Sequence, residues 1–484
     1  MDIVTVLNRA VDRHGDRQFL FDPNRSVTFA EADAASNAAA HDLIGRGVVQ
    51  GDAVALAASD RVSLWLAIIA VWKAGALPSL IDARTPEARL PYFVNDIGAK
   101  AVVAASELFE RLAGAGARDL VDLESLGAQG STAAVSHHGP DSPLFLSYTS
   151  GTTGDPKGVV LLSEPVTLGT SCIADRLQLS HDDVLLTTTP ISSSFQLIAA
   201  LMPALHVGAS VGLVAGSTTD VIWEVATAHQ ATVLVAYPLT LADIVNSPRA
   251  AVAGSPFRVA LSGGSSLAPR IKRDYAQRLG ITLLESYGQS ELGGFMALGA
   301  PHDPQEVLDA GFAGRPLPDR LAFVGDEHAN EVEAGQLGEV LVANGFFHDY
   351  RNKPDKLEEA IRFGVLHTGD LGVAGVDGHL KVVGRLSEYS RAVERGGFLR
   401  DVEDAYYEHP AVQHAVAVEA SGVIEGFVEL RSGQEASPEE LRAFVAERVP
   451  SALRPADTTV LDEMPRTFSG KADRLALAGR IGPS

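Results

Sequence analysis

The sequence predicts an α/β and α+β protein: a large N-terminal domain of parallel-rich sheets flanked by helices, with a small β-barrel-like section, followed by a small mobile α+β C-terminal domain. The chain has 484 residues, more than one ordinary hydrophobic core accommodates. Short apolar segments alternate with helical patterns over most of its length, as in parallel sheets covered by helices. A helix–strand–strand–helix pattern fills residues 385–484.

The first predicted elements are a capped helix and two strands around a buried helix. Thr28 stands three residues before Glu31, a spacing typical of a capping box at a helix start. A strand, a helix and a second strand are predicted at residues 54–57, 64–74 and 77–82. The helix carries the longest apolar run of the chain, which is too short to span a bilayer, so no membrane span is expected.

The middle of the chain repeats this alternation before its composition changes. Strands are predicted at residues 101–104, 185–188, 233–236 and 259–261, and helices at 197–205, 221–228 and 268–279. Residues 335–384 are rich in glycine and β-branched residues, which indicates the barrel-like section. We therefore place the large domain at residues 1–384 and the small domain at 385–484. The small domain is predicted to contain helices at 402–408 and 438–448 and strands at 412–418 and 423–430.

Composition restricts the classes of partner and the compartment. The formal net charge of −22 argues against nucleic acid and anionic membranes as partners. The single cysteine, Cys172, excludes a disulfide within the chain and is expected to be a small buried hydrophobe. The N-terminus lacks the basic start and apolar core of a signal peptide. We expect a cytoplasmic protein.

Residues 147–158 combine hydroxyl side chains, three glycines and a lysine in one short loop between two apolar runs. Glycines let backbone N–H groups approach an anion, hydroxyls add donors, and a lysine adds a positive charge. The pattern predicts a strand, a phosphate-binding loop and a strand, and hence a nucleoside triphosphate as ligand. It differs from the common G-x-x-x-x-G-K-[ST] loop. The predicted phosphate-binding residues are Thr149, Ser150, Gly151, Thr152, Thr153, Gly154 and Lys157.

Further segments follow in an order that carries a family resemblance. They are Tyr287-Gly288-Gln289-Ser290-Glu291, His367-Thr368-Gly369-Asp370, Gly384-Arg385 and Pro465-Arg466-Thr467-Phe468-Ser469-Gly470-Lys471. Together with the loop, they resemble the adenylate-forming superfamily of acyl-CoA synthetases, peptide-synthetase adenylation domains and luciferases. The resemblance covers nearly the whole chain. It implies that a carboxylate attacks the α-phosphorus of ATP, with Mg²⁺, to give an acyl-adenylate and pyrophosphate.

The resemblance also implies roles for individual residues of the nucleotide site. The loop would hold the β- and γ-phosphates, Tyr287 would stack on adenine, and Asp370 and Arg385 would bind the ribose. The site would be completed by Gly263, Gly264, Ser286 and Gly288.

The catalytic residues implied by the resemblance come from both domains. Ser290 would donate to the α-phosphate, and Glu291 would coordinate Mg²⁺. Lys471 would bridge the carboxylate and the α-phosphate as charge builds there. Arg385 would mark the domain junction, and Ser387 would be the hinge about which the small domain rotates for a second half-reaction, usually thioester formation.

The segment after the hinge departs from the family pattern. Relatives carry a glycine in a hairpin that enters the site during the thioester step, but equal spacing puts Val393 or Glu394 at that position here. These residues tolerate a positive φ poorly, so the same hairpin is not expected. We expect thioester formation to be weak, unusual or delegated to a partner, such as a carrier protein or a second ligase.

The acyl pocket departs as well. Small residues, Ser192, Ser193 and Ser194, replace the aromatic–histidine pair of many relatives, and residues 192–196 contain no acidic side chain to pair an amino group. This favours a bulky apolar carboxylate, aromatic or polycyclic, although the serines could equally face solvent. The other predicted pocket residues are Tyr237, Gly264, Gly293 and Gly294.

The interpretation is an ATP- and Mg²⁺-dependent carboxylic acid ligase of the acyl-CoA synthetase type, expected in a specialised secondary pathway. The acyl acceptor would be CoA or the phosphopantetheine thiol of a carrier protein. Two alternatives stay open: an amide synthetase with an amine acceptor, and a regulatory nucleotide-binding protein without catalysis. The presence of Lys471, Glu291 and Asp370 argues against the regulatory alternative.

Overall fold

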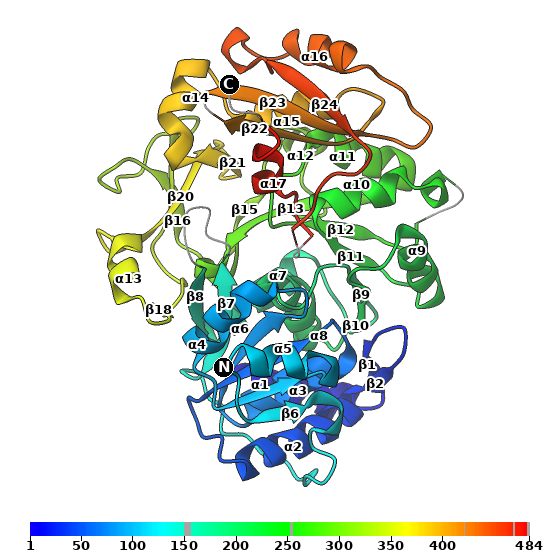
Figure 1. The fold of residues 1–484 in the computed structure, drawn as a ribbon, viewed down its shortest axis with the longest axis vertical. Coiled ribbons are helices and arrows are strands. Elements are labelled where there is room, and N and C mark those ends of the chain that lie inside the picture. The colour runs from blue at the N-terminus through cyan, green and yellow to red at the C-terminus, as the bar shows by residue number, and fades with distance from the viewer. Residues whose placement is uncertain (150–155, 252–254, 421, 468–469, 482–484) are drawn as a thin grey trace.

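The structure, a computed structural model, describes residues 1–149, 156–251, 255–420, 422–467 and 470–481. Figure 1 shows a large body built of sheets and helices, with the C-terminal elements forming a separate layer at one end of the longest axis. This agrees with the predicted fold class.

The first sheet has seven strands in the order β18-β8-β7-β4-β3-β5-β6. Its strands are β3 (Ala53–Ala58), β4 (Leu77–Asp82), β5 (Ala101–Ala104), β6 (Leu120–Asp122), β7 (Pro143–Thr149), β8 (Lys157–Leu162) and β18 (Asp349–Tyr350). The central strands pair in parallel, whereas β8 pairs antiparallel with β7 and β18. Strand β3 is buried along its whole length, as expected for a strand covered on both faces.

The second sheet has nine strands in the order β15-β14-β13-β12-β11-β9-β10-β1-β2. Its strands are β1 (Gln18–Phe21), β2 (Ser26–Thr28), β9 (Val184–Thr187), β10 (Ser210–Leu213), β11 (Val233–Ala236), β12 (Val259–Ser262), β13 (Thr282–Gln289), β14 (Gly294–Leu298) and β15 (Arg315–Pro316). The strands from β9 to β13 and β1 pair in parallel, so their carboxyl ends open at one edge.

Helices cover and separate the two sheets. They are α1 (Ile3–His14), α2 (Phe29–Gly45), α3 (Val62–Lys73), α4 (Leu90–Ile97), α5 (Phe109–Gly114), α6 (Ser163–Arg176), α7 (Ser194–Gln196), α8 (Met202–Val207), α9 (Thr219–Ala228), α10 (Pro238–Asn246), α11 (Pro269–Asp274), α12 (Gln305–Asp309) and α13 (Pro354–Ala360). The predicted capping box at Thr28 and Glu31 is confirmed.

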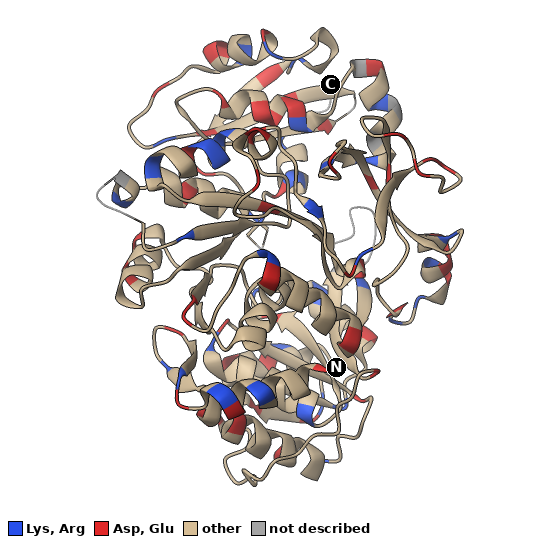
Figure 2. Cartoon of the chain, turned by 180° about the vertical axis from the view of Figure 1, so that it is seen from behind, with Lys and Arg blue, Asp and Glu red and all other residues tan. Residues whose placement is uncertain are grey.

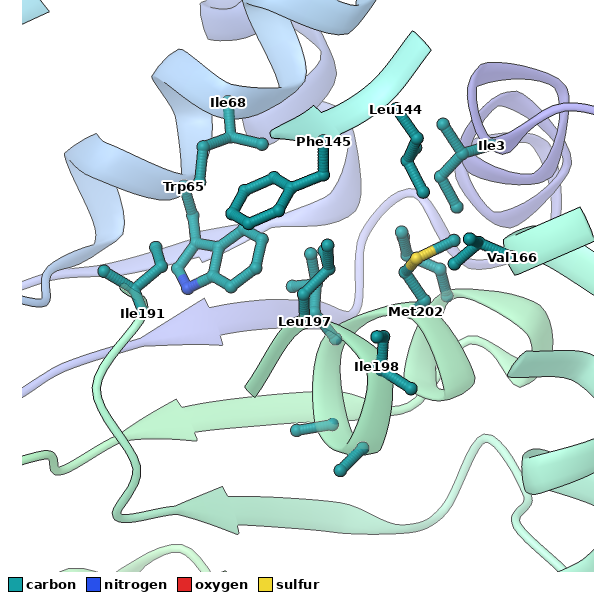
Figure 3. Close-up of a cluster of buried hydrophobic side chains, with 14 of the residues drawn as sticks. Ile3, Trp65, Ile68, Leu144, Phe145, Val166, Ile191, Leu197, Ile198 and Met202 are labelled. Carbon is teal, nitrogen blue, oxygen red and sulfur yellow. The ribbon is translucent and has the colours of Figure 1, made fainter. Parts of the chain in front are cut away.

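The hydrophobic core contains side chains of helices that pack against both sheets. Figure 3 shows Trp65 and Ile68 of α3 and Phe145 of β7 facing Leu197 and Ile198, which belong to the π-helical turn between α7 and α8. These side chains are almost entirely inaccessible to water. Because α7 leads directly into this core, the positions of the residues at its start are fixed by packing.

A third, antiparallel sheet forms the section predicted as barrel-like. Its strands are β16 (Ala322–Gly325), β17 (Leu337–Val342), β19 (Ile361–Arg362), β20 (Val365–Ala374) and β21 (Leu380–Arg385). Strand β20 pairs with β17, β19 and β21, so it is central to this sheet. The end of β21 leads to the C-terminal elements.

The C-terminal part is a three-stranded sheet with helices. Its elements are α14 (Tyr389–Arg395), α15 (Leu399–Tyr407), β22 (Val412–Ala420), β23 (Val423–Leu430), α16 (Pro438–Ala446), β24 (Asp457–Leu461) and α17 (Arg474–Ala478). The strand order is β22-β23-β24, with β24 parallel to β23. In Figure 1 this layer lies against α10 and α11 of the large domain, and β22 contacts α10 directly.

Acidic side chains are distributed over both domains, as Figure 2 shows, and are interspersed with basic ones. Among the described residues, no helix combines the length and apolarity that a bilayer crossing requires.

Candidate active site

Strands β7 and β8 flank the predicted phosphate-binding loop. Thr149 ends β7 and pairs with Lys157, which begins β8. The predicted loop residues Ser150, Gly151, Thr152, Thr153 and Gly154 lie outside the described residues, as does the Thr149 side chain. Lys157 Nζ lies 3.4 Å from the Tyr350 hydroxyl and 4.5 Å from the centroid of its ring. The lysine is therefore held at the base of the loop by an aromatic side chain from β18.

Glu291 lies in the short turn Ser290–Leu292 between β13 and β14. Its Oε1 accepts a hydrogen bond of 2.9 Å from the Tyr350 hydroxyl. Burial and the neighbouring Glu291 raise the pKa of Tyr350, so its hydroxyl stays a neutral donor. Tyr350 therefore links the carboxylate of Glu291 to the ammonium of Lys157. A carboxylate fixed near Lys157, at the end of the predicted phosphate-binding loop, is a donor that fits Mg²⁺.

The Asp370 carboxylate binds the other side chains that were predicted to contact the nucleoside. Its Oδ1 lies 3.0 Å from Arg385 Nη1, and its Oδ2 accepts a 2.7 Å hydrogen bond from the Tyr287 hydroxyl. Gln289 Nε2 donates to the same Oδ2. Burial raises the pKa of Asp370, although Arg385 opposes the shift. The structure thus brings together Tyr287, Asp370 and Arg385, from β13, β20 and β21.

The carboxyl end of β12 places glycines where larger residues would not fit. At Gly264, φ is +79°, and a Cβ atom would lie 2.7 Å from Tyr237 Cε1 and 3.0 Å from Lys471 Cε. The site therefore requires glycine at this position, because both neighbours approach the backbone closely. Gly263 precedes it, and Ser286 on β13 uses its hydroxyl to donate to the Ser262 carbonyl at 2.8 Å.

The remaining predicted glycines lie in the β13–β14 hairpin. Gly288 pairs with Phe295, Gly293 ends the turn that carries Ser290 and Glu291, and Gly294 begins β14. Ser290 and Glu291 of the motif and the predicted pocket glycines, Gly293 and Gly294, thus lie in the same hairpin.

Lys471 reaches the large domain from the C-terminal tail. Its ammonium lies 5.5 Å from the centroid of the Tyr237 ring. Backbone hydrogen bonds close its turn, with the Thr467 N–H donating to the Lys471 carbonyl at 2.7 Å. Burial lowers the pKa of Lys471, and the positive charge of Arg385 lowers it further. The small domain is therefore oriented so that its lysine enters the same site as Gly264 and Arg385.

The segment predicted to line the acyl pocket surrounds the start of α7. The Tyr237 hydroxyl donates to Ser193 Oγ at 2.6 Å, and Ser193 in turn caps α7, whose first residue is Ser194. The Phe195 ring stacks against Tyr237 with centroids 5.5 Å apart and tilts against Phe295 at 5.6 Å. An aromatic wall thus lies beside Tyr237 and the Lys471 ammonium.

Two carboxylates from the first sheet approach this segment. The sequence did not predict either contact. Ser192 Oγ donates to Asp82 Oδ2 at 2.6 Å, and Gln196 Nε2 donates to Asp60 Oδ2 at 2.7 Å. Burial raises the pKa of Asp60 to about 7. Residues 192–196 contain no acid themselves, but the carboxyl ends of β3 and β4 supply two. The hydroxyl of Ser192 is therefore bonded within the protein.

The segment after β21 forms helices. Ser387 lies exposed in the short 3₁₀ turn Leu386–Glu388, directly after Arg385. Residues 389–395 form α14, and a helix thus stands where the family resemblance would place a hairpin. Val393 lies on this helix with 61% of its surface exposed.

Comparison with known proteins identifies the family. Residues 7–346 match the AMP-binding enzyme family, and residues 401–471 match the AMP-binding enzyme C-terminal domain. The chain belongs to this family of adenylate-forming ligases, which use ATP.

Individual relatives are similar over most of the chain. It is 27% identical to 4-hydroxybenzoate--CoA/benzoate--CoA ligase of Rhodopseudomonas palustris over 97% of this chain and 92% of that protein. It is also 27% identical to a linear gramicidin synthase protein of Brevibacillus parabrevis, over 93% of this chain but only 9% of that much longer protein. The crystal structure of the anthranilate CoA ligase AuaEII with anthranoyl-AMP has a TM-score of 0.90, with 21% identity over 99% of this chain and 97% of that one.

Proposed function

We propose that this enzyme activates an aromatic or other bulky carboxylic acid with ATP and Mg²⁺, forming an acyl-adenylate and pyrophosphate, and then passes the acyl group to the thiol of CoA or of a carrier protein. The observation that carries the proposal is the placement of the Lys471 ammonium against Tyr237 and Gly264. In the proposal this cation from the small domain would meet the carboxylate and the α-phosphorus that it attacks.

In this proposal, different residues bind different charged and polar groups of the reactants. Lys157, at the end of the loop, would neutralise the leaving phosphates, and Asp370 and Arg385 would bind the ribose hydroxyls. Glu291, oriented by Tyr350, would hold Mg²⁺. When bound, the ion supplies positive charge to the phosphate oxygens. Lys471 would stabilise the charge that develops between the carboxylate and the α-phosphate, a contact typically worth about 3–4 kcal/mol in the transition state.

The surroundings of Tyr237 support an aromatic acid as the substrate. The rings of Phe195, Tyr237 and Phe295 form an aromatic cluster beside the Lys471 ammonium, and an aryl group packs favourably against aromatic rings. The names of a similar ligase, for 4-hydroxybenzoate and benzoate, and of a similar structure with anthranoyl-AMP point the same way. Asp60 and Asp82 bond to Gln196 and Ser192, which lie in the same segment as Phe195.

The comparisons do not favour the alternative of an amide synthetase, and one structural observation keeps it as a second candidate. The helix α14 stands where the resemblance would place a hairpin of the thioester step, and an amine acceptor needs no pantetheine channel. Supplying one acyl-adenylate with CoA and, separately, with simple amines distinguishes the two candidates.

A panel of acids tests the proposal. Benzoate, 4-hydroxybenzoate, 2-aminobenzoate, 2-succinylbenzoate, malonate and a medium-chain fatty acid are incubated with ATP and Mg²⁺, and pyrophosphate release is measured. We expect an aryl acid to give the highest rate. A panel without acid-dependent release, confirmed by the absence of ATP–pyrophosphate exchange, would contradict the proposal.

Lys471→Ala tests the role of the tail lysine. We expect pyrophosphate release to fall by about two to three orders of magnitude, because the transition-state contact is lost. Lys356→Ala is the control, since Lys356 is half exposed and pairs with Glu359 on the surface of α13. Normal turnover by the Lys471 variant would remove this assignment.

A further inference from the structure

Asp243, on α10 of the large domain, binds three side chains of the small domain. Its Oδ1 accepts hydrogen bonds from Gln413 Nε2 at 2.8 Å and from His414 Nε2 at 2.7 Å. Its Oδ2 accepts a hydrogen bond from Arg466 Nη2, also at 2.7 Å. His414 is fully buried, and because a carboxylate only accepts, its Nε2 carries the proton. One carboxylate thus joins β22 and the tail loop to α10.

Arg466 belongs to the loop that carries Lys471. Arg466 and Ala472 form a backbone bridge, and the Asp473 N–H donates to the Pro465 carbonyl at 2.8 Å. The two sides of the loop are therefore tied together, so fixing Arg466 restricts the position of Lys471.

Helix α10 and its N-cap residue contact two side chains of the loop, Lys471 and Arg466. Tyr237 caps the start of α10, and its ring faces the Lys471 ammonium; Asp243 lies further along α10 and binds Arg466. Since Gln413, His414 and Arg466 all belong to the small domain, a rotation that withdraws Lys471 from the site breaks all three bonds to Asp243. These bonds therefore stabilise only the orientation in which Lys471 is in place.

We infer that Asp243 is a positioning residue for adenylate formation, which holds the Lys471 loop on α10 through Arg466, His414 and Gln413. The inference rests on the proposed function of the Lys471 site and extends it to a residue without contact to the reactants. Removing the carboxylate is expected to disfavour the adenylate-forming orientation while leaving the other orientations unaffected.

The first test needs no substrate. Asp243→Asn keeps the side-chain shape but removes the charge, and its amide can accept at only one atom. Hydrogen–deuterium exchange of the full-length protein is compared for peptides covering residues 470–478. We expect exchange there to be about ten times faster in the variant, with peptides of β12 unchanged. Equal exchange in the variant and the wild-type protein would overturn the inference.

The matched control removes a different interdomain ion pair. Arg273 Nη2 on α11 lies 2.5 Å from Glu408 Oε1 of the small domain, and neither residue belongs to the tail loop. Glu408→Gln also replaces one interdomain carboxylate by an amide, and we expect exchange of residues 470–478 to stay at the wild-type rate. The same acceleration in this control would assign the effect to general loosening of the interface and overturn the inference.

The second test separates the half-reactions, with the most active acid of the panel. In Asp243→Asn, the kcat for pyrophosphate release is expected to fall about tenfold or more, and the KM for ATP to change by less than about threefold, because no ATP contact is lost. Acyl transfer from a supplied acyl-adenylate is expected to continue at the wild-type rate, and Asp243→Glu to restore most of the kcat. Equal loss in both half-reactions would overturn the inference. If no acid is activated by the wild-type protein, the proposed function fails, whereas the exchange measurement still decides the role of Asp243.

Discussion

Lys471 and Arg385 are two cations that meet in one site although they come from different ends of the small domain. The Lys471 ammonium is buried against the large domain, and Arg385 adds a second positive charge near it. Both effects disfavour the protonated ammonium in the free enzyme. The phosphates of ATP would compensate for this cost, so the free site has a charge arrangement suited to a polyanion. Asp370 neutralises part of the Arg385 charge, which orients the guanidinium without cancelling the field.

This arrangement predicts the pH dependence of adenylation. In the proposed mechanism the protonated form of Lys471 is the active one, and its pKa is lowered, so kcat/KM for pyrophosphate release should fall as pH rises through a value below 10.5. Arg385→Ala removes a repulsion and should raise the pKa of Lys471, moving the alkaline limb upward even if the overall rate is lower. Arg391→Ala, an exposed arginine on α14 paired with Glu419, is the control and should leave the limb in place. An unmoved limb in Arg385→Ala would assign it to another group.

At the residue scale, the sequence identified side chains within motifs but not their supports from distant segments. Tyr287, Asp370, Arg385 and Lys471 could be named because each lies in a short pattern with a chemical meaning. Tyr350 could not, since only the pairing of β18 with β8 brings its hydroxyl to Glu291. The same holds for the acids near the pocket segment: their approach depends on two parallel strands ending beside α7, which no local pattern reveals.

At the scale of elements, the short apolar segments predicted strands well, because strands such as β5 and β11 are buried along their whole length. The strands at residues 101–104, 233–236 and 423–430 have the predicted limits. Helix limits were less accurate: the helix predicted at 197–205 begins at Ser194 and contains the π-helical turn Leu197–Leu201. Such a turn arises where tertiary packing competes with regular hydrogen bonding, so periodicity alone does not locate it.

Helix α14 gives the element-scale prediction. Residues 389–395 are helical and Val393 is exposed, in agreement with the expectation that this segment does not form the hairpin of the relatives. We expect acyl transfer to CoA to be slower than adenylation of the same acid by about tenfold or more, which corresponds to about 1.4 kcal/mol in activation free energy. Pyrophosphate release and CoA thioester formation are measured side by side. Hydroxylamine, a small acceptor that needs no channel, is the control and should capture the adenylate as fast as it forms; equal rates with CoA would refute the prediction.

At the scale of the whole molecule, the small domain shares apolar contacts with the large domain as well as the bonds to Asp243. Leu239 of α10 packs in one cluster with Val416, Phe427 and Met464 of the small domain. These contacts and the polar ones favour the orientation that brings Lys471 to Tyr237. A second half-reaction with a bulky acceptor would require the site to open, so the chain must exchange one set of contacts for another about a short segment.

That segment gives the last prediction. Ser387 lies in the first turn of the 3₁₀ helix after Arg385, where a backbone N–H has no helical partner, so proline fits without breaking a helical bond. Proline fixes φ and removes one of the torsions about which the small domain would rotate. Ser387→Pro should therefore keep pyrophosphate release within about threefold of wild type but slow acyl transfer to the preferred acceptor by about tenfold or more. Ser387→Ala keeps the backbone free and should perform both steps normally. If proline slowed both steps equally, or neither, the rotation would take place about residues other than Ser387.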